Sequence, residues 1–348
     1  MNKLTLATAH EVLQEYLCSV WALAQEAGIQ EVMVNRADDI WIERLGTMSR
    51  VPDCYVHPDA LDRAITILAN INAKEQTHLL DARLPGLRIA AARAPVAIYG
   101  DMLCIRKHTR HRVALTDYEE AGAFRVLPAS VRPSFTRTNE ALLSRLSTGG
   151  GAVREFFEWV MRERINVALS GGTSSGKTTL LNALLDAMDP DDRTITIEDT
   201  AELQVRLPNY IGLETNHGIS MRELVKFSLR IRPDRIIVGE VRGAEAFDLM
   251  EALNTGHPGS VVSFHADSSD TAPARLESLI RMSDEGRLLP LEDLRQKIAS
   301  TFRFFVHAAR HGASRGPVEI REVLGVSSGR YVTRLLFSKV ANEELIDA

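Results

Sequence analysis

A glycine-rich octapeptide in the middle of the chain has the residue types and spacing of a phosphate-binding loop. Residues 171–178 read Gly-Gly-Thr-Ser-Ser-Gly-Lys-Thr and match G-x-x-x-x-G-K-[ST] in full. Backbone N–H groups of such a loop, with the start of the helix that follows, form a concave site for the β-phosphate. We expect Lys177 to reach the β- and γ-phosphates and Thr178 to hold Mg²⁺. The predicted ATP contacts are Gly171, Gly172, Thr173, Ser174, Ser175, Gly176, Lys177, Thr178 and Thr179.

A second segment, residues 235–240, reads as an apolar strand that delivers an acid to the phosphates. The usual Asp-Glu pair at its end is absent, because Gly239 stands where the aspartate would be. Glu240 is therefore expected to contact the metal, through water, and to activate the attacking water, or to share these duties with another carboxylate. The alternative is a solvated carboxylate at a strand end.

Glu198 is the candidate for that second carboxylate. It follows the apolar residues of Thr-Ile-Thr-Ile, at the edge where an open α/β sheet binds ligands. It needs only hydrogen-bond reach to a nucleophilic water to act as general base or water-positioning group. The competing interpretation is that Asp199 or Thr200 caps the next segment.

Two histidines and one basic run complete the candidate groups. His257 and His265 bracket a predicted strand, where a histidine can sense the γ-phosphate by hydrogen bonding; the alternative is that they are packed structural residues. Residues 105–112 form the most basic stretch of the chain, which suits nucleic acid, acidic lipid or a nucleotide held by another domain, or else a solvated loop.

The elements that must position these groups change character along the chain. An N-terminal segment of mixed helices and strands predicts a small α+β domain over residues 1–112, and residues 113–139 are predicted to be a linker. From residue 140 to 348, helices alternate with short apolar strands, which indicates a P-loop domain with a mostly parallel sheet. The predicted helices are 9–27, 57–72, 118–120, 140–146, 152–163 and 177–187. The predicted strands are 32–34, 39–43, 87–93, 102–106, 165–169, 194–197, 236–238 and 261–264.

Composition limits the classes of protein that need to be considered. The 348 residues carry a net charge of −5, which argues against nucleic acid as the main partner. Three scattered cysteines form neither a disulfide framework nor a zinc site and fit a reducing compartment. With no signal peptide and no apolar run long enough to span a bilayer, we expect a cytoplasmic protein, at most peripheral on a membrane.

Four segments in one order resemble the VirB11-type secretion ATPases, within the larger group of type II and type IV secretion and pilus ATPases. They are the Walker A loop at 171–179, the Asp box at 195–203, the Walker B segment at 229–243 and the His box at 255–265. Gly239 before the catalytic glutamate is shared with that family. Many relatives have glycine where Ser174 stands, so this loop is stiffer if that position needs positive φ.

This resemblance implies an α/β chain whose small α+β N-terminal domain precedes a RecA-like P-loop NTPase domain. It implies a homohexamer that uses ATP and Mg²⁺, bound between the two domains of each subunit. Domain closure around the phosphates is then expected to drive pilus biogenesis and transfer of DNA or protein by a type IV secretion or conjugation system. Of the arginines Arg83, Arg88, Arg106, Arg230 and Arg232, we favour Arg106 as a contact to the phosphates.

The implied location is the cytoplasmic face of the inner membrane, with membrane components of the secretion machine as partners and no specific nucleic-acid binding. Val-Arg-Gly after Glu240, rather than Met-Arg-Asp, favours the VirB11 type over pilus retraction motors. The alternatives are a type IV or Flp/Tad pilus assembly ATPase, a RecA-like nucleic-acid motor, and a nucleotide-binding scaffold with negligible turnover.

Overall fold

A computed structural model describes residue 11 and residues 13–72, 74, 78–107, 114–120, 122–126, 139–312 and 314–340. The chain divides into two compact units, each described here by itself. Unit 1 comprises Met1–Pro133 with Asn216–Ile219, and unit 2 comprises Ser134–Thr215 with Ser220–Ala348. Most of the predicted linker 113–139 lies outside the described residues, so its limits stay a prediction.

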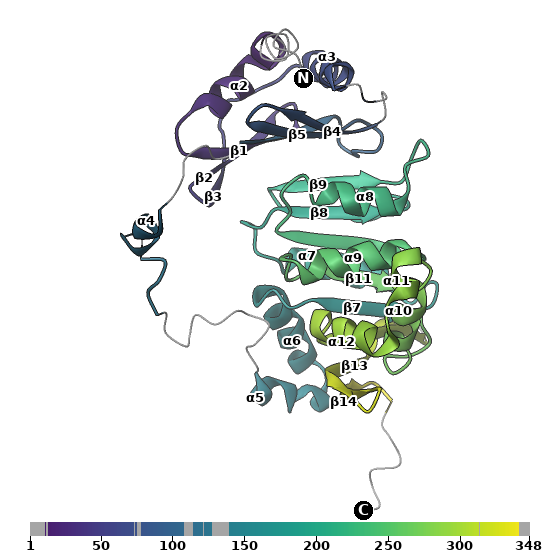
Figure 1. The fold of residues 1–348 in the computed structure, drawn as a ribbon. Helices are drawn as coiled ribbons and strands as arrows, with labels where there is room; N and C mark the ends of the chain where they lie inside the picture. Colours follow the sequence, from purple (N-terminus) through teal and green to yellow (C-terminus); the bar gives the residue numbers. More distant parts are fainter. Residues whose placement is uncertain are drawn as a thin grey trace, which may run out of the picture. The chain divides into compact units, whose positions relative to one another are not determined.

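Unit 1 is built on an antiparallel six-stranded sheet in the order β3-β2-β1-β6-β5-β4. Its strands are β1 (Ile29–Arg36), β2 (Asp39–Arg44), β3 (Thr47–Arg50), β4 (Leu79–Leu84), β5 (Leu87–Ala92) and β6 (Met102–Lys107). Apolar side chains of α2 (Cys18–Gln25) and α3 (Pro58–Ile71) share one core with this sheet (Figure 1). Helix α3 has proline at its first position and an N-cap, His57, that accepts a hydrogen bond from Asp59, both of which favour a helix start there.

Unit 2 contains an eight-stranded sheet in the order β14-β13-β12-β7-β11-β10-β8-β9. Pairings from β12 through β7 to β9 are parallel, and the two pairings of β13 are antiparallel. The strands are β7 (Val167–Gly171), β8 (Thr194–Glu198), β9 (Tyr210–Glu214), β10 (Arg235–Val241), β11 (Val261–Phe264), β12 (Phe304–His311), β13 (Ser314–Ser327) and β14 (Arg330–Ser338). This confirms the predicted mostly parallel sheet.

Helices precede this sheet or connect most of its strands. They are α5 (Glu140–Leu143), the 3₁₀ helix η3 (Leu146–Thr148), α6 (Gly151–Arg162), α7 (Lys177–Asp186), α8 (Met221–Ser228), α9 (Glu245–Asn254), α10 (Ala272–Ile280), α11 (Asp284–Leu288) and α12 (Leu291–Thr301). A further short helix, α4 (Leu115–Glu120), belongs to unit 1. Within the described ranges, none of the helices combines the length and apolar character needed to cross a bilayer.

The central strands bring the predicted chemistry to one edge of the sheet. β7, β8 and β11 are buried along their whole length, and each is followed by a polar or glycine-rich turn. Because parallel strands end at the same edge, Gly171, Glu198, Glu240 and His265 meet there. The alternation of apolar strand and polar end is therefore the feature that builds the site.

The structure differs from the sequence predictions in one interrupted helix and in several strands that were not predicted. The predicted helix 9–27 is interrupted at Leu17, whose φ of −122° is not helical, and the residues before 11 lie outside the described part. β3, β4, β9 and β12–β14 were not predicted. β3 and β13 carry many polar residues because they lie at or next to a sheet edge, so neither forms an apolar run.

Candidate active site

The glycine-rich loop joins β7 to α7 and packs closely against a neighbouring strand. Gly171 has no room for a side chain, since a Cβ there would collide with the Ala308 carbonyl oxygen of β12. Gly176 caps α7 with φ of +94°, a conformation that favours glycine. The loop backbone is therefore held by conformations that only these glycines adopt without strain.

Ser174 has a φ of +59°. This is the left-handed backbone conformation that glycine adopts more easily than serine. We expect Ser174→Gly to raise the free energy of unfolding by about 1 kcal/mol, because glycine adopts left-handed backbone without steric cost. Thr173→Gly is the matched control, because Thr173 does not have positive φ and glycine there should destabilise. Denaturant unfolding of both variants checks this; equal destabilisation by both substitutions would contradict it.

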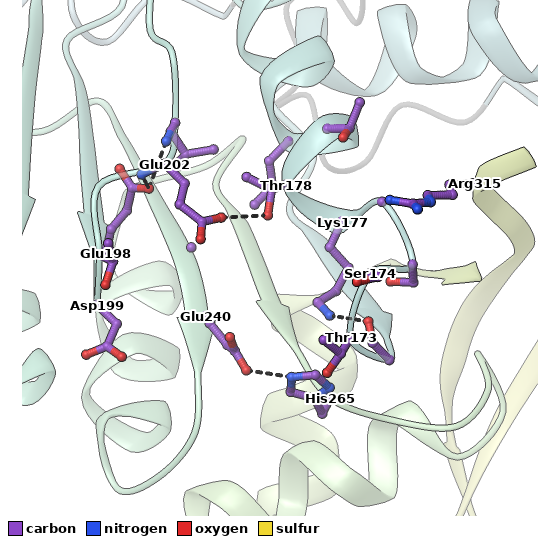
Figure 2. Close-up of a pocket in the computed structure, with 18 of the residues that line it drawn as sticks. Thr173, Ser174, Lys177, Thr178, Glu198, Asp199, Glu202, Glu240, His265 and Arg315 are labelled. Carbon is purple, nitrogen blue, oxygen red and sulfur yellow. Dashed lines mark hydrogen bonds and ion pairs between the residues drawn. The ribbon is translucent and has the colours of Figure 1, made fainter. Parts of the chain in front are cut away.

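Lys177 lies over the loop and points back into it (Figure 2). Its ammonium donates hydrogen bonds to the carbonyl oxygens of Gly171, at 2.7 Å, and Gly172, at 3.0 Å. Burial lowers the pKa of Lys177, and the negative charge of Glu240 offsets only part of this. The ammonium is thus partly desolvated and close to where the phosphates are expected, which strengthens its attraction for an anion.

Thr178 lies beside a carboxylate that the sequence predictions did not include. The Thr178 hydroxyl donates to Glu202 Oε2 at 3.3 Å, and both residues line the same hollow (Figure 2). Such hard oxygen donors suit Mg²⁺, which protein sites usually hold through one or two side chains together with phosphates and water. Over the part of the chain that the structure describes, no cluster of three acidic, histidine or cysteine side chains could bind a metal alone. Thr178 and Glu202 are oxygen donors of the kind that Mg²⁺ would need beside a nucleotide.

Glu240 points into this hollow from the end of β10 and is surrounded by positive charge (Figure 2). Its Oε1 lies 2.7 Å from His265 Nε2, and its Oε2 accepts a hydrogen bond from Arg242 Nη2 at 3.0 Å. Burial raises the pKa of Glu240, but the hydrogen bond from Arg242 and the charges of Arg242, His265 and Lys177 outweigh it and lower the pKa overall. The carboxylate therefore stays ionised at neutral pH.

Arg242 is a second residue that the sequence predictions did not place in the site. Its guanidinium links Glu240 to Asp199 Oδ2, at 2.8 Å, and so joins the ends of β10 and β8. The side chain is 63% exposed and is held by its ion pairs with these two carboxylates. Arg242 lies two residues after Glu240, inside the Walker B segment, and this position could have predicted that it belongs to the site.

Glu198 is buried, with 3% of its surface exposed, and its contacts are mainly to backbone. Its Oε2 accepts hydrogen bonds from the N–H groups of Glu202, at 2.9 Å, and Leu203, at 3.0 Å. Burial raises the pKa of Glu198 although these bonds oppose it. A Cβ on Gly239 would lie 3.1 Å from Glu198 Cγ, so the glycine that replaces the usual aspartate leaves the space that Glu198 fills.

The structure separates the two predicted histidines. His265 follows β11 at the ligand edge and lines the hollow. His257 precedes β11, at the opposite end of that strand, and its Nδ1 lies 2.9 Å from the Ala252 carbonyl oxygen. It is not among the residues that line the hollow. Since a parallel strand presents only its carboxyl end to the phosphates, the structure does not bring His257 to the site.

Arg106 lies on β6 of unit 1, where its Nε donates to the buried Glu31 Oε2 at 2.9 Å. The neighbouring Lys107 donates to the Glu26 carbonyl oxygen at 2.9 Å, and residues 108–112 of the basic run lie outside the described part of the chain. A contact from Arg106 to a nucleotide therefore stays a prediction.

The assembled hollow has a volume of about 460 Å³ and lies entirely within unit 2. From the predicted nucleotide contacts it contains Gly172, Thr173, Ser174, Ser175, Gly176, Lys177, Thr178 and Thr179. It also contains Arg315, which comes from β13, far along the chain from the loop. The hollow thus combines an anion-binding loop with the ionised Glu240 opposite it, an arrangement that suits phosphoryl transfer.

Known proteins are similar to this sequence over most of its length. The family model "Type II/IV secretion system protein" matches residues 17–310. The conjugal transfer protein TrbB of Rhizobium radiobacter is 31% identical over 316 residues, covering 88% of each chain. The type IV secretion system protein VirB11 of Brucella suis is 33% identical over 296 residues, which cover 80% of this chain and 80% of the relative.

A solved structure agrees with the fold. The VirB11 ATPase of the Brucella suis type IV secretion system, crystallised with sulphate, superposes with a TM-score of 0.82 at 28% identity, covering 90% of this chain and 95% of that one. Since both the family model and the relatives span most of the sequence, the chain belongs to the Type II/IV secretion system protein family, as a VirB11-like ATPase.

Proposed function

We propose that this chain hydrolyses Mg²⁺-bound ATP as a homohexamer and thereby powers pilus biogenesis and transfer of DNA or protein through a type IV secretion or conjugation system. The observation that carries the ATPase chemistry is the ionised Glu240, which faces Lys177 across the hollow with Arg242 and His265 on its two oxygens. The relatives named for conjugal transfer and type IV secretion support the choice of machine.

The geometry favours different roles for the two glutamates. Glu240 is ionised and open to the hollow, so it can accept a hydrogen bond from the attacking water and orient it towards the γ-phosphate. Glu198 is buried and holds the backbone of 202–203, so we assign it a positioning role. Environments that push the pKa values of two carboxyl groups in opposite directions are a usual way to divide such duties.

The remaining groups would bind and orient the triphosphate. Lys177 would exchange its bonds to two loop carbonyls for β- and γ-phosphate oxygens. Mg²⁺, held by Thr178 with Glu202 or Glu240, would neutralise charge on those oxygens when bound. His265 lies against Glu240 in the same hollow, and its Nε2–H would have to leave that carboxylate to donate a hydrogen bond to the γ-phosphate.

Assembly and location are the wider part of the proposal. The family resemblance and the names of the relatives support a hexameric ring at the cytoplasmic face of the inner membrane, with Arg106 reaching the phosphates and secretion-machine components as partners. A pilus assembly ATPase with the same chemistry is the second candidate. Loss of DNA transfer from donor cells that carry only Glu240→Gln would favour conjugation, whereas loss of pili from cells that transfer no DNA would favour pilus assembly.

The ring predicts a distinctive response to mixed subunits. Wild type and Glu240→Gln are co-refolded or exchanged at several ratios, and ATP turnover is measured with molar mass by light scattering. If sites act in concert around a ring of six, turnover should fall more steeply than the wild-type fraction. A strictly linear fall, or a monomer mass at full activity, would contradict the cooperative ring.

A further inference from the structure

Four polar side chains lie in the interior of unit 2, close to the ligand edge of its sheet, and the proposed chemistry does not use them. Ser170 and Ser269 have none of their surface exposed, His307 has 8% exposed, and Glu319 is half-buried. Burial of a polar group costs free energy unless the group is hydrogen-bonded. The hydrogen bonds of these four residues therefore show which parts of the unit they hold together.

Glu319 of β13 holds the chain that follows His265. Its Oε2 accepts hydrogen bonds from the Ser269 N–H, at 3.0 Å, and from the Ser269 hydroxyl, at 2.7 Å. Burial raises the pKa of Glu319, but the bonds from Ser269, with His307 and Arg321 nearby, outweigh it and lower the pKa overall. The carboxylate is therefore ionised at neutral pH, and bonds to an ionised acceptor are the stronger kind.

Arg321 makes a second contact from the same strand to the same turn. Its Nε donates to Ser269 Oγ at 3.3 Å, and its Nη1 lies 3.4 Å from Asp270 Oδ1. Since alternate residues of a strand share a face, Glu319 and Arg321 reach the turn side by side. Asp270 is 69% exposed, so its ion pair adds little stability. Glu319 is thus the main anchor of this turn.

The segment 265–270 depends on such anchors because it belongs to neither a helix nor a strand. It connects β11 to α10 and carries His265 at its start. The Arg275 guanidinium donates to the His265 carbonyl oxygen at 3.3 Å, and the imidazole Nε2 lies 2.7 Å from Glu240 Oε1. The place of the imidazole beside Glu240 therefore depends on side chains that hold this segment, of which Glu319 makes the buried contact.

The strand that carries Glu319 also contacts the phosphate-binding loop. The Gly316 N–H donates to the Ser175 carbonyl oxygen at 3.1 Å, three residues before Glu319 on β13. One strand thus bonds the loop at one point and Ser269 at another. These are the two walls of the hollow that bring Lys177 and His265 to its interior.

The register of the inner strands continues this contact to the root of the loop. β12 places His307 directly opposite Glu319 and beside Ser170 of β7, whose Oγ lies 3.0 Å from His307 Nδ1. The pairing of β12 with β13 skips Val318, and bulges of this kind re-aim side chains next to active sites. Glu319, His307 and Ser170 form a polar row across three strands that ends one residue before the glycine-rich loop.

We propose that Glu319 is a positioning residue for ATP hydrolysis: through Ser269 it holds the segment 265–270 in place relative to the phosphate-binding loop, so that the imidazole of His265 meets Glu240. The proposal rests on the proposed roles of Glu240 and His265. Because β13 bonds both walls of the hollow, only the side chain of His265 has to turn when it exchanges Glu240 for the γ-phosphate.

The test is a double-mutant cycle on ATP turnover by the full chain with Mg²⁺. Glu319→Ala removes both bonds to Ser269 and should lower kcat by about 10- to 100-fold, the size of effect expected when a reacting group is misplaced. ADP affinity should stay unchanged, because Glu319 does not line the hollow. In a His265→Ala background the same substitution should cause no further loss, since Glu319 acts through His265. Single-turnover hydrolysis of radiolabelled ATP extends the measurement to slow variants.

Three further variants separate positioning from a loss of stability. Glu319→Gln keeps an oxygen that can accept both bonds from Ser269 and should restore most of the turnover. Glu277→Ala removes another buried carboxylate, which pairs with Arg295 at 2.8 Å outside the hollow, and should lower the free energy of unfolding without changing kcat in either background. Ser269→Ala removes only the hydroxyl bond and repeats the cycle if Glu319→Ala does not fold.

The outcomes separate this proposal from the proposed function. An equal fold-loss of kcat from Glu319→Ala in the wild-type and His265→Ala backgrounds would overturn the positioning role, as would wild-type kcat in folded Glu319→Ala. A fall in ADP affinity as large as the fall in kcat would also overturn it, because the loss would then lie in binding. A wild type that does not hydrolyse ATP would instead overturn the proposed function, and this is seen before any variant is compared.

Discussion

Glu240→Gln is expected to lower kcat for ATP hydrolysis by about 10²- to 10⁴-fold, which is the range for loss of a general base. The substitution keeps the shape of the side chain and removes the charge that orients water. ATP affinity should change little, since Lys177 and the loop backbone make the predicted phosphate contacts. Steady-state turnover and ATP titration on the same sample measure the two effects separately.

The controls for Glu240→Gln use carboxylates that differ in their relation to the site. Asp199→Asn removes one of the two carboxylates that tether Arg242, so a smaller loss of kcat is expected. Glu251→Gln changes a surface residue of α9 that pairs with Lys297, outside the hollow, and should leave turnover unchanged. Equal activity of wild type and Glu240→Gln would remove Glu240 from the mechanism.

Lys177→Ala is expected to weaken ATP binding by about 10²-fold and to abolish measurable turnover. The ammonium is the only charged group of the loop, and charge-assisted bonds to two phosphates contribute about 1.5–3 kcal/mol each. The partial burial that lowers its pKa also strengthens its attraction for phosphate. Calorimetric titration with ATP measures the loss of affinity directly.

A matched lysine shows whether the effect is local. Lys226→Ala removes an exposed ammonium from α8, next to Asp248, and should change neither affinity nor turnover. Unfolding curves are needed for both variants, because Lys177 also bonds the carbonyls of Gly171 and Gly172. ATP affinity equal to that of wild type in Lys177→Ala would mean that the phosphates bind elsewhere.

The parts of the site that sequence could predict are those set by local pattern. The loop 171–178 could be predicted from neighbouring residues alone, because an apolar strand precedes it and a helix follows it. The structure contains this strand and this helix. Likewise, Glu240 and His265 each come at the end of an apolar strand. Because neighbouring parallel strands end at the same edge of a sheet, the sequence could predict that the two side chains lie close together.

The rest depended on packing between segments far apart in sequence. Glu202 and Arg242 stood inside recognised motifs, but their partners, Thr178 and Asp199, are set by how strand ends meet. The buried orientation of Glu198 follows from the missing side chain of Gly239 on the adjacent strand. Arg315 lies at the loop because β13 pairs with β12 and because the Gly316 N–H donates to the Ser175 carbonyl oxygen, and the polar sequence of β13 gave no sign of either contact.

The most direct test of the whole account is Mg²⁺-dependent ATP hydrolysis by the purified chain, with ATP binding and molar mass measured on the same samples. The account predicts that wild type turns over ATP only with Mg²⁺, that Glu240→Gln binds ATP but stalls, and that both assemble alike. A wild type that binds ATP in the assembled state yet does not hydrolyse it would contradict the proposed mechanism.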